Sequence, residues 1–384
     1  MGSAQRGEDA ERRAMVRGLF PRLGRVAFLN HAAEARIPEP VRLAITAMAD
    51  QMAEPEGPDA LELADALRSK IGALINAEAS AVAITRSTAH GISLIANGLS
   101  WRDGDNVVAA AGDYPAGVYP WMALAGRGVE LRLAEAIEGV ISPQAVLDLV
   151  DARTRVVCVN HVQFATGYRL DVARIGAECR RLGVLFCVDV MQSVGAVAVD
   201  TAAMKIDVAA SGGHKWLLGP SGAAFCYIRP DLLVTIPPLV AGALSVTDKY
   251  NFTQYKPQWA PDAHRFEETW LSLPNLAGLS AAVDLATEVG IDLIERAVLA
   301  RTRELSDALV AAGMTLATPW PRPPEQTSAI VSFKHPRHGA TEVVEALHSA
   351  QVLCSRRGEF VRLSPHYYNQ DAEIARALDV ITSL

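Results

Sequence analysis

The sequence predicts an α/β fold: a large domain with a mostly parallel, seven-stranded sheet between helices, and a smaller C-terminal α+β domain. Two observations lead to this prediction. From about residue 60, short apolar runs alternate with helical patterns, and strands that are apolar at every position are typical of parallel sheets buried on both faces. After about residue 235 this alternation stops. A chain of 384 residues, 50% of them hydrophobic, is long enough for two such domains.

The large domain is predicted from strand and helix patterns that follow one another along the chain. Short runs interpreted as strands lie at residues 81–85, 106–110, 130–133, 155–160, 184–188, 208–211 and 223–228. Helical patterns, in which apolar residues recur three and four positions apart, fill the gaps at residues 60–76, 88–99, 142–150 and 173–182. We therefore expect strands that are joined by helices and covered by them on both faces.

The C-terminal part of the chain has a different character. A polar stretch at residues 245–264 predicts a long loop or linker. Residues 274–312 predict one or two long helices that stop at Gly313, and residues 327–384 show the strand and helix order of a small α+β domain. The predicted organisation is an N-terminal segment (1–25), a large domain (26–245), and a linker with the small domain (246–384).

Charge and composition exclude several classes of protein. The net charge of −7 and the scattered basic residues do not predict a nucleic-acid surface. No run approaches the ~20 uninterrupted apolar residues of a membrane span, and residues 1–17 lack the apolar stretch of a signal peptide. The five cysteines have no metal-ligand spacing, and three lie in apolar runs. We expect a reduced, cytoplasmic protein that binds no metal ion, nucleic acid or membrane.

The strongest chemical motif is the run Ser-Gly-Gly-His-Lys-Trp-Leu-Leu-Gly-Pro at residues 211–220. Lys215 follows a predicted strand and lies in a glycine-rich turn, where the backbone can approach a ligand closely. Burial beside a cationic cofactor favours loss of the lysine proton, which Schiff-base chemistry requires. Asp189 ends an earlier strand, at the sheet edge where α/β proteins bind ligands, and can keep a pyridine nitrogen protonated. Each alone is more often a surface lysine or a helix cap, but together they predict a site.

Through this run, the chain resembles the class V aminotransferase superfamily, and within it the isopenicillin N epimerase-like proteins and group II cysteine desulfurases. The similarity extends from Phe-Leu-Asn at residues 28–30 to Tyr-Asn at residues 368–369. The resemblance implies a fold-type I enzyme that uses pyridoxal 5'-phosphate. It also implies a homodimer with the active site at the interface, although the family's Gly-Thr pair after Arg-Phe-Glu is absent, which leaves Thr269 or Ser272 for the cross-subunit phosphate contact.

The resemblance also implies the residues that hold the cofactor. Lys215 would carry the Schiff base and move the proton at Cα, while Asp189 would pair with the pyridine nitrogen. Gln192 would donate to the phenolic oxygen, and Ser211 and His214 match positions that hold the phosphate.

Two more segments match the family near the cofactor. Thr88 and Ala89 belong to a second phosphate turn, residues 85–91, where a helix N-terminus favours an anion. Tyr114 is the candidate for a catalytic residue stacked on the ring. The alternative for the turn at residues 85–91 is a simple helix cap, and the alternative for Tyr114 is a buried aromatic residue at a strand end. Where the desulfurases carry Asn, this chain has Phe164, and Gln163 is the candidate substitute.

The expected substrate is a small amino acid, and its carboxylate calls for a planar, permanently charged fork. By resemblance Arg362 is the first candidate for this contact and Arg357 the second, the alternative being a surface ion pair. His31 falls in the family's N-terminal lip over the substrate and is a further candidate contact, with a bystander role as the alternative.

The reaction is predicted from what the desulfurase pattern lacks. Group II desulfurases carry a nucleophilic cysteine on a loop that here is shorter and without cysteine, at residues 357–362. Cys354 precedes that loop in an apolar context typical of a strand, so persulfide chemistry on it is rejected. The leading hypothesis is a lyase that cleaves a Cβ–S bond in a cysteine-derived amino acid, for which Lys215 is the base. Transamination or epimerisation is the alternative, and a non-catalytic binding protein is a third.

Overall fold

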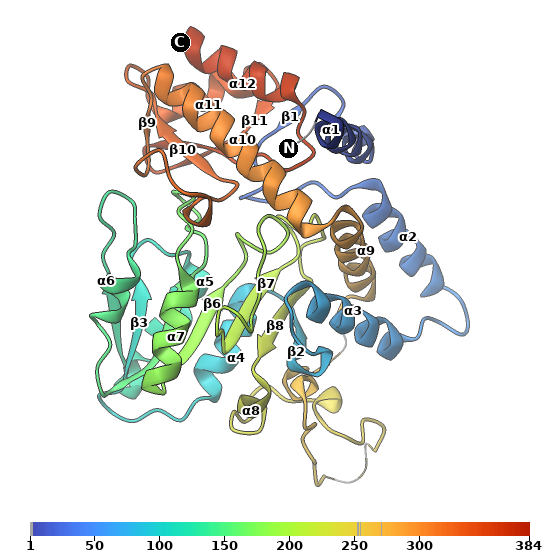
Figure 1. Cartoon of the computed structure of the whole chain (residues 1–384). Helices are drawn as coiled ribbons and strands as arrows, with labels where there is room; N and C mark the ends of the chain where they lie inside the picture. Colours follow the sequence, from blue (N-terminus) through green and yellow to red (C-terminus); the bar gives the residue numbers. More distant parts are fainter. Residues whose placement is uncertain (1–2, 252, 254, 270) are drawn as a thin grey trace.

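The structure, a computed structural model, describes residues 3–251, 253, 255–269 and 271–384. At its centre lies a seven-stranded sheet with the strand order β2-β8-β7-β6-β5-β3-β4 (Figure 1). Its strands are β2 (Val82–Thr85), β3 (Asn106–Ala110), β4 (Glu130–Ala134), β5 (Thr154–Asn160), β6 (Leu185–Asp189), β7 (Val208–Gly212) and β8 (Ala224–Ile228). Only β8 runs antiparallel to its neighbours. The predicted mostly parallel sheet is confirmed, with strand ends within two residues of those expected.

Both faces of this sheet are buried. Successive residues along the inner strands belong to different apolar clusters: Val107 and Cys187 pack on one face, Val108 and Val188 on the other, while the edge strand β4 is partly exposed. All four are fully buried. Because side chains alternate along a strand, a strand that is covered on both sides must be apolar at every position, which is the pattern that predicted the sheet.

Helices cover the sheet and connect its strands. Those of the large domain are α3 (Ala60–Leu74), α4 (Thr88–Gly98), α5 (Pro115–Met122), α6 (Pro143–Leu147), α7 (Val172–Leu182) and α8 (Pro230–Leu233). The sequence did not predict α5, which is short and contains Pro120, so it shows too little periodicity. The predicted helix at 142–150 is confined to the five residues of α6.

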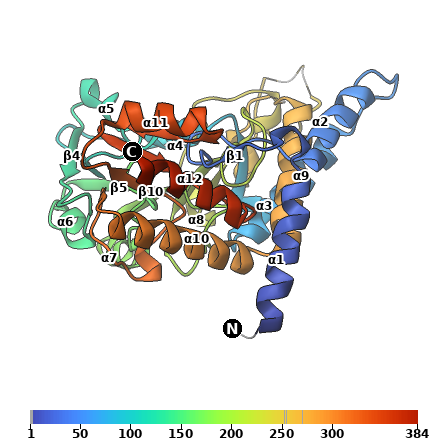
Figure 2. The ribbon, with the colours of Figure 1, turned by 90° about the horizontal axis from the view of Figure 1, so that it is seen from above.

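Two further helices lie near the N-terminus, α1 (Ser3–Gly18) and α2 (Glu39–Gln51). Neither was predicted. Figure 2 shows α1 along one side of the molecule beside α9 (Leu273–Val289). The guanidinium of Arg12 donates to the carbonyl of Val289, and Arg17 pairs with Glu373 at 2.9 Å. These contacts tie α1 to the C-terminal part of the chain.

The stretch between β8 and α9 is mainly loop, as predicted, with short 3₁₀ turns at Ala243–Ser245 and Ala263–Phe266. The long helical segment is two helices, α9 and α10 (Ile291–Ala311). Gly290 separates them with φ of +91°, a conformation that glycine adopts at no steric cost. The expectation of one or two helices is thus resolved as two.

The C-terminal elements form a second layer above the large sheet (Figure 1). An antiparallel sheet has the order β12-β13-β10-β9. Its elements and those around it are β9 (Thr315–Leu316), β10 (Val331–Lys334), α11 (Ala340–Ser349), β11 (Val352–Leu353), β12 (Ser355–Arg357), β13 (Phe360–Leu363) and α12 (Asp371–Ser383). This is the predicted α+β character.

The N-terminal strand β1 (Ala27–Phe28) pairs in parallel with β11, and Asn30 bridges to Ser364. The segment that follows, with Ala32 and Ala33, is thereby held against the strand ends of the large sheet. The domain boundaries at residues 25 and 245 remain a prediction, and β1 lies with the C-terminal elements.

The five cysteines are buried and form no disulfide. Burial raises the pKa of Cys226 and of Cys354 to about 12, so both thiols are protonated near neutrality. Within the described ranges, no helix combines the length and the apolar character required to cross a membrane.

Candidate active site

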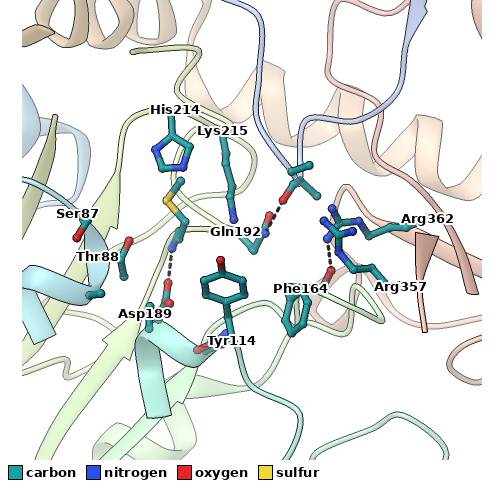
Figure 3. Close-up of a pocket in the computed structure, with 16 residues that line it drawn as sticks. Ser87, Thr88, Tyr114, Phe164, Asp189, Gln192, His214, Lys215, Arg357 and Arg362 are labelled. Carbon is teal, nitrogen blue, oxygen red and sulfur yellow. Dashed lines mark hydrogen bonds between the residues drawn. The ribbon is translucent and has the colours of Figure 1, made fainter. Parts of the chain in front are cut away.

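A pocket of about 350 Å³ opens where the strands of the large sheet end (Figure 3). Asn160 and Asp189, the last residues of β5 and β6, lie opposite one another in the parallel pairing. The pocket is lined by Ala32, Ala33, Ser87, Thr88, Ala89, Tyr114, Ala116, Asn160, Phe164, Asp189, Met191, Gln192, His214, Lys215, Arg357 and Arg362. Most of the residues predicted for cofactor and substrate are therefore brought together at one sheet edge, the position expected of an α/β ligand site.

Lys215 lies three residues after β7 and is 9% exposed. Its Nζ lies 5.3 Å from the centre of the Tyr114 ring. Burial lowers the pKa of this lysine to about 8; the charge of Asp189 opposes the shift, and Arg362 and Arg357 add to it. The neutral amine, the form that attacks a carbonyl carbon, is therefore far more populated near neutral pH than in an exposed lysine.

Asp189 is 4% exposed, and its Oδ1 accepts a hydrogen bond from the Met191 amide at 2.8 Å. Burial raises its pKa to about 6, against the effects of that amide and of Lys215. Among the described residues no Lys, Arg or His forms an ion pair with this carboxylate. A buried carboxylate without a cationic partner is costly, so a protonated pyridine nitrogen would fit this position.

The end of the pocket away from the two arginines suits a phosphate (Figure 3). Ser87 caps α4 by accepting a hydrogen bond from the His90 amide, and Thr88 Oγ1 accepts one from the Gly212 amide at 3.1 Å. The helix N-terminus supplies free N–H donors and a favourable dipole for an anion. His214 Nδ1 is buried and has no partner among the described residues. Ser87 was not among the predicted residues, although its place before a helical pattern is a cap signal.

Ser211 is not among the residues that line the pocket, so its contact with the phosphate stays a prediction. Its side chain is fully buried, and its hydroxyl donates to the Gly212 carbonyl at 2.9 Å and lies 3.5 Å from Met191 Sδ. Met191, which contacts the Ser211 hydroxyl through its sulfur, lines the pocket in place of Ser211. The His214 ring lines the phosphate end instead.

Gln192 fastens three segments together. Its Nε2 donates to the carbonyl of Ala32 at 2.9 Å, and its Oε1 accepts from the indole N–H of Trp216 at 2.8 Å. The side chain thus links the N-terminal segment to the residue after Lys215 while one amide hydrogen stays available for a ligand.

Tyr114 precedes α5 and is 45% exposed at the pocket mouth. Its ring meets Phe164 edge to face, with centroids 5.3 Å apart. Gln163 does not take the place of the missing polar contact, because its amide donates to Asp113 and it does not line the pocket. The polar group from this segment is Asn160, whose Oδ1 is buried without a partner in the described part of the chain.

Two arginines form the far wall of the pocket (Figure 3). Arg362 on β13 is fully buried, and its Nη1 donates to the carbonyl of Phe164 at 2.6 Å. Its Nε and Nη2 are buried with no partner among the described residues. Arg357 lies on β12, next to it in the sheet. Burial lowers the pKa of Arg362 to about 9, with a further contribution from Arg357. No carboxylate of the described chain forms an ion pair with either arginine.

His31 lies outside the pocket lining, so a substrate contact by this residue stays a prediction and its bystander alternative fits its position better. It is fully buried, with Nδ1 2.9 Å from the Ser364 carbonyl and Nε2 2.7 Å from the Tyr368 hydroxyl. Its ring stacks on Trp216 at 5.9 Å. Burial lowers its pKa well below the ordinary value, so His31 is a neutral packing residue beneath the site.

A second buried carboxyl, Asp113, supports the strand-end loop. Its oxygens accept hydrogen bonds from the Asn160 amide, at 3.0 Å, and from the Gln163 side chain. Burial raises the pKa of Asp113 to about 7, opposed by these hydrogen bonds and reinforced by Asp189. Asp113 is thus half-protonated near neutral pH while the loop it holds forms the pocket wall at Asn160.

This pKa predicts a pH-dependent stability. Between about pH 4, where an unfolded Asp titrates, and pH 7, the folded state keeps a proton on Asp113 that the unfolded state has lost. Stability therefore falls as pH rises through this window, by at most about 1.4 kcal/mol per pH unit. Asp113→Asn removes this titration, so the melting temperature of the variant should rise relative to the wild type from pH 5 to pH 7. A difference between the two proteins that stays constant with pH would contradict the buried acid.

Taken together, a buried lysine with a lowered pKa, a buried strand-end carboxylate and an anion-binding helix N-terminus on this sheet define the site of a fold-type I pyridoxal-phosphate enzyme. The family model for aminotransferase class-V matches residues 27–376. The chain belongs to this family.

Individual proteins similar to this chain support the same family assignment. The chain is 32% identical over 331 residues, 80% of each protein, to a probable cysteine desulfurase from Methanothermobacter thermautotrophicus. It is 27% identical over 369 residues, 96% of each, to the uncharacterized aminotransferase YcbU of Bacillus subtilis. A solved structure of the cystine C-S lyase C-DES with its product cysteine persulfide superposes with a TM-score of 0.87 at 25% identity, over 95% of this chain and 99% of that one. Another C-DES structure carries glycine linked to the PLP cofactor. The predicted family, fold type and cofactor are confirmed.

Proposed function

We propose that this enzyme is a lyase that cleaves the Cβ–S bond of a cysteine-derived amino acid and uses no persulfide-forming cysteine. The observation that carries the proposal is the content of the pocket: a lysine, a carboxylate and an unpaired arginine face one cavity, and no cysteine is among its lining residues within the described chain. The names of C-DES as a cystine C-S lyase and of several relatives as cysteine desulfurases support sulfur chemistry on this scaffold.

The residues would share the work as follows. Pyridoxal phosphate, when bound, withdraws electrons from the substrate Cα and so makes its hydrogen acidic. Asp189 would hold the pyridine nitrogen protonated, and Ser87, Thr88, Ala89 and His214 would hold the phosphate. Lys215 would hold the cofactor between turnovers and remove the Cα proton as its neutral amine. Arg362 would fix the substrate carboxylate through Nε and Nη2, the two donors that have no protein partner.

The reaction balances without a second redox partner. Lys215 takes the Cα proton, the electron pair forms a Cα–Cβ double bond, and the Cβ–S bond breaks with its electrons on sulfur. The sulfur leaves as a thiolate, or as a persulfide anion where the substrate is cystine, and takes a proton. Water then converts the released enamine to pyruvate and ammonia. No step requires a nucleophile aimed at sulfur, in keeping with a pocket wall built of Phe164 and arginines.

Transamination is the second candidate, and the likeness to YcbU, named an uncharacterized aminotransferase, favours it. It uses the same lysine, which would return the proton to the cofactor rather than let the side chain leave. Epimerisation on the same residues is the remaining form of this alternative. A non-catalytic role is disfavoured by the joint presence of Lys215 and Asp189 in one pocket.

We also propose a homodimer, in which a partner subunit completes the phosphate end.

Product analysis tests the proposal. Purified enzyme with pyridoxal phosphate is incubated with cystine, S-methyl-L-cysteine and S-carboxymethyl-L-cysteine. Pyruvate, ammonia and the sulfur product are measured, the last being cysteine persulfide from cystine and a thiol from the other two substrates. A lyase should give the three products in equal amounts and retain the visible cofactor band. Loss of that band to the pyridoxamine form, without pyruvate from a cysteine conjugate, would establish the transaminase instead.

Cys354→Ala should leave product formation within about twofold of the wild type. The thiol is 3% exposed, it does not line the pocket, and burial raises its pKa to about 12, so it is neither placed nor ionised for attack on sulfur. Sulfide and pyruvate release are measured for both proteins, with Cys179→Ala as a control for the effect of emptying a buried site. Abolished sulfur release in the Cys354 variant alone would restore the persulfide mechanism.

A further inference from the structure

The far wall of the pocket carries more positive charge than an amino acid with one carboxylate would use. Three cationic side chains line the cavity, Lys215, Arg357 and Arg362, against a single carboxylate, Asp189, among the described lining residues. The charge of Asp189 acts on Lys215, whose pKa it raises against the effect of burial. The two arginines have no acidic partner in the described chain.

The cofactor phosphate does not supply the missing charge. Figure 3 shows Ser87, Thr88 and His214 at one end of the pocket and the two arginines at the other, with Lys215 and Tyr114 between them. The phosphate end is thus separated from the arginine wall by the side chains that would flank the cofactor ring. Within the described chain, this leaves the substrate as the source of anions for Arg357 and Arg362.

Arg362 alone can hold one carboxylate. Its Nη1 is engaged by the carbonyl of Phe164, at 2.6 Å, which fixes the plane of the guanidinium. Nε and Nη2, the remaining edge of the fork, are buried and unpaired in the described structure. This edge matches the two oxygens of a carboxylate, so the α-carboxylate leaves Arg357 unused.

Arg357 is placed by a tight hairpin. It pairs with Phe360 across the turn at Gly358, whose φ of +57° favours glycine. Arg357 shares a sheet face with Arg362, because Ser355, two residues before it, lies directly opposite Arg362. Its Nη1 donates to the carbonyl of Arg356 at 2.7 Å, and its other nitrogens have no protein hydrogen bond in the described chain. The side chain is half-buried at the pocket wall.

We infer that the substrate is an amino acid with a second anionic group on its side chain, a carboxylate or a sulfur oxyacid, and that Arg357 binds this group while Arg362 binds the α-carboxylate. The inference deepens the proposed lyase function and rests on it for the reaction. For a cysteine-derived substrate, the sulfur would then carry an acidic substituent, which leaves with it when the Cβ–S bond breaks.

Two matched substrates test the inference. S-carboxymethyl-L-cysteine and S-carbamoylmethyl-L-cysteine differ only by a carboxylate in place of an amide, and pyruvate release gives kcat/KM for each. The wild-type holoenzyme should prefer the acid by about ten- to a hundredfold, the range expected of one charged hydrogen-bonded contact. Arg357→Gln should abolish this preference by lowering kcat/KM for the acid alone, and Arg357→Lys should retain part of it.

Arg356→Gln is the matched control. Arg356 is the adjacent residue of the same strand, its Nη1 donates to Thr341 Oγ1 at 2.9 Å, and it does not line the pocket. The variant makes the same change in net charge and should keep the full preference. A wild-type enzyme that treats the two substrates alike, or an Arg357→Gln enzyme that keeps the preference, would overturn the inference.

Binding without turnover separates this inference from the lyase proposal. L-Aspartate, L-asparagine and L-cysteate are titrated against the holoenzyme, and the change in cofactor absorbance gives Kd. An Arg357-dependent preference for aspartate over asparagine supports the second-anion site even if no cysteine conjugate yields pyruvate. Tighter binding of cysteate than of aspartate identifies the sulfur oxyacid, and the reverse identifies the carboxylate. Equal binding of aspartate and asparagine would refute the site even if the enzyme is a lyase.

Discussion

Lys215→Ala should lower the rate of pyruvate release by at least about a thousandfold. The amine has two tasks, holding the cofactor between turnovers and removing the Cα proton, and a positioned acid–base group alone contributes about 10²–10⁴-fold. Its burial and its pKa of about 8 make it the group suited to both. The rate is measured with saturating substrate and added cofactor, so that weak cofactor binding does not itself produce the loss.

The control for this variant is Lys256→Ala, which removes an exposed lysine that does not line the pocket. It should retain the wild-type rate, and both variants should keep the wild-type circular dichroism spectrum. Retention of more than a tenth of the activity by a folded Lys215→Ala protein would remove this lysine from the mechanism.

Asp189→Asn should lower kcat by at least about a hundredfold with a small change in KM. Asn keeps the shape of the side chain but not its charge, and loss of one partner from a buried ion pair costs about 3–5 kcal/mol. The charge matters most when electrons move from Cα into the cofactor ring, so the loss falls on the chemical step. Steady-state kinetics at pH 8, above the Asp189 pKa of about 6, measure the effect with the wild-type carboxylate ionised.

Asp284→Asn is the matched control, because this carboxylate pairs with Lys70 on the surface at 2.7 Å and exposed pairs contribute little. It should behave as the wild type. A kcat for Asp189→Asn within threefold of the wild type would mean that the ring nitrogen does not depend on this carboxylate.

Most of the large sheet could be predicted because its strands are buried on both faces. Val156 and Val157, for example, are fully buried in different apolar clusters, so the strand is marked by continuous apolar character. The helix α5 could not be predicted, since eight residues with an internal proline give neither periodicity nor a recognisable stop. The N-terminal strand β1 has two residues and depends on pairing with β11, more than three hundred positions away.

Residues that stand at the family's motif positions and point toward the cavity line the pocket. Residues at such positions whose side chains point elsewhere do not line it. Lys215, Asp189 and Arg362 follow from their motifs and reach one pocket. Ser211 belongs to the lysine motif, but its hydroxyl turns to the backbone beside Met191. His31 precedes two lining residues, Ala32 and Ala33, yet contacts Ser364 and Tyr368 beneath them. On a strand such as β7, one position reverses the direction of a side chain, and in the turn at residues 31–33 the sequence does not show which side chains reach the pocket.

The central claim, that the cofactor is carried by Lys215, is tested most directly by locating it. Purified enzyme with pyridoxal phosphate is treated with borohydride, which makes the bond between cofactor and amine permanent, and digested peptides are analysed by mass spectrometry. We predict one modified peptide that contains residues 211–220, with the added mass on Lys215. Modification of another lysine in its place, or no stable modification of a protein that has taken up the cofactor, would contradict it.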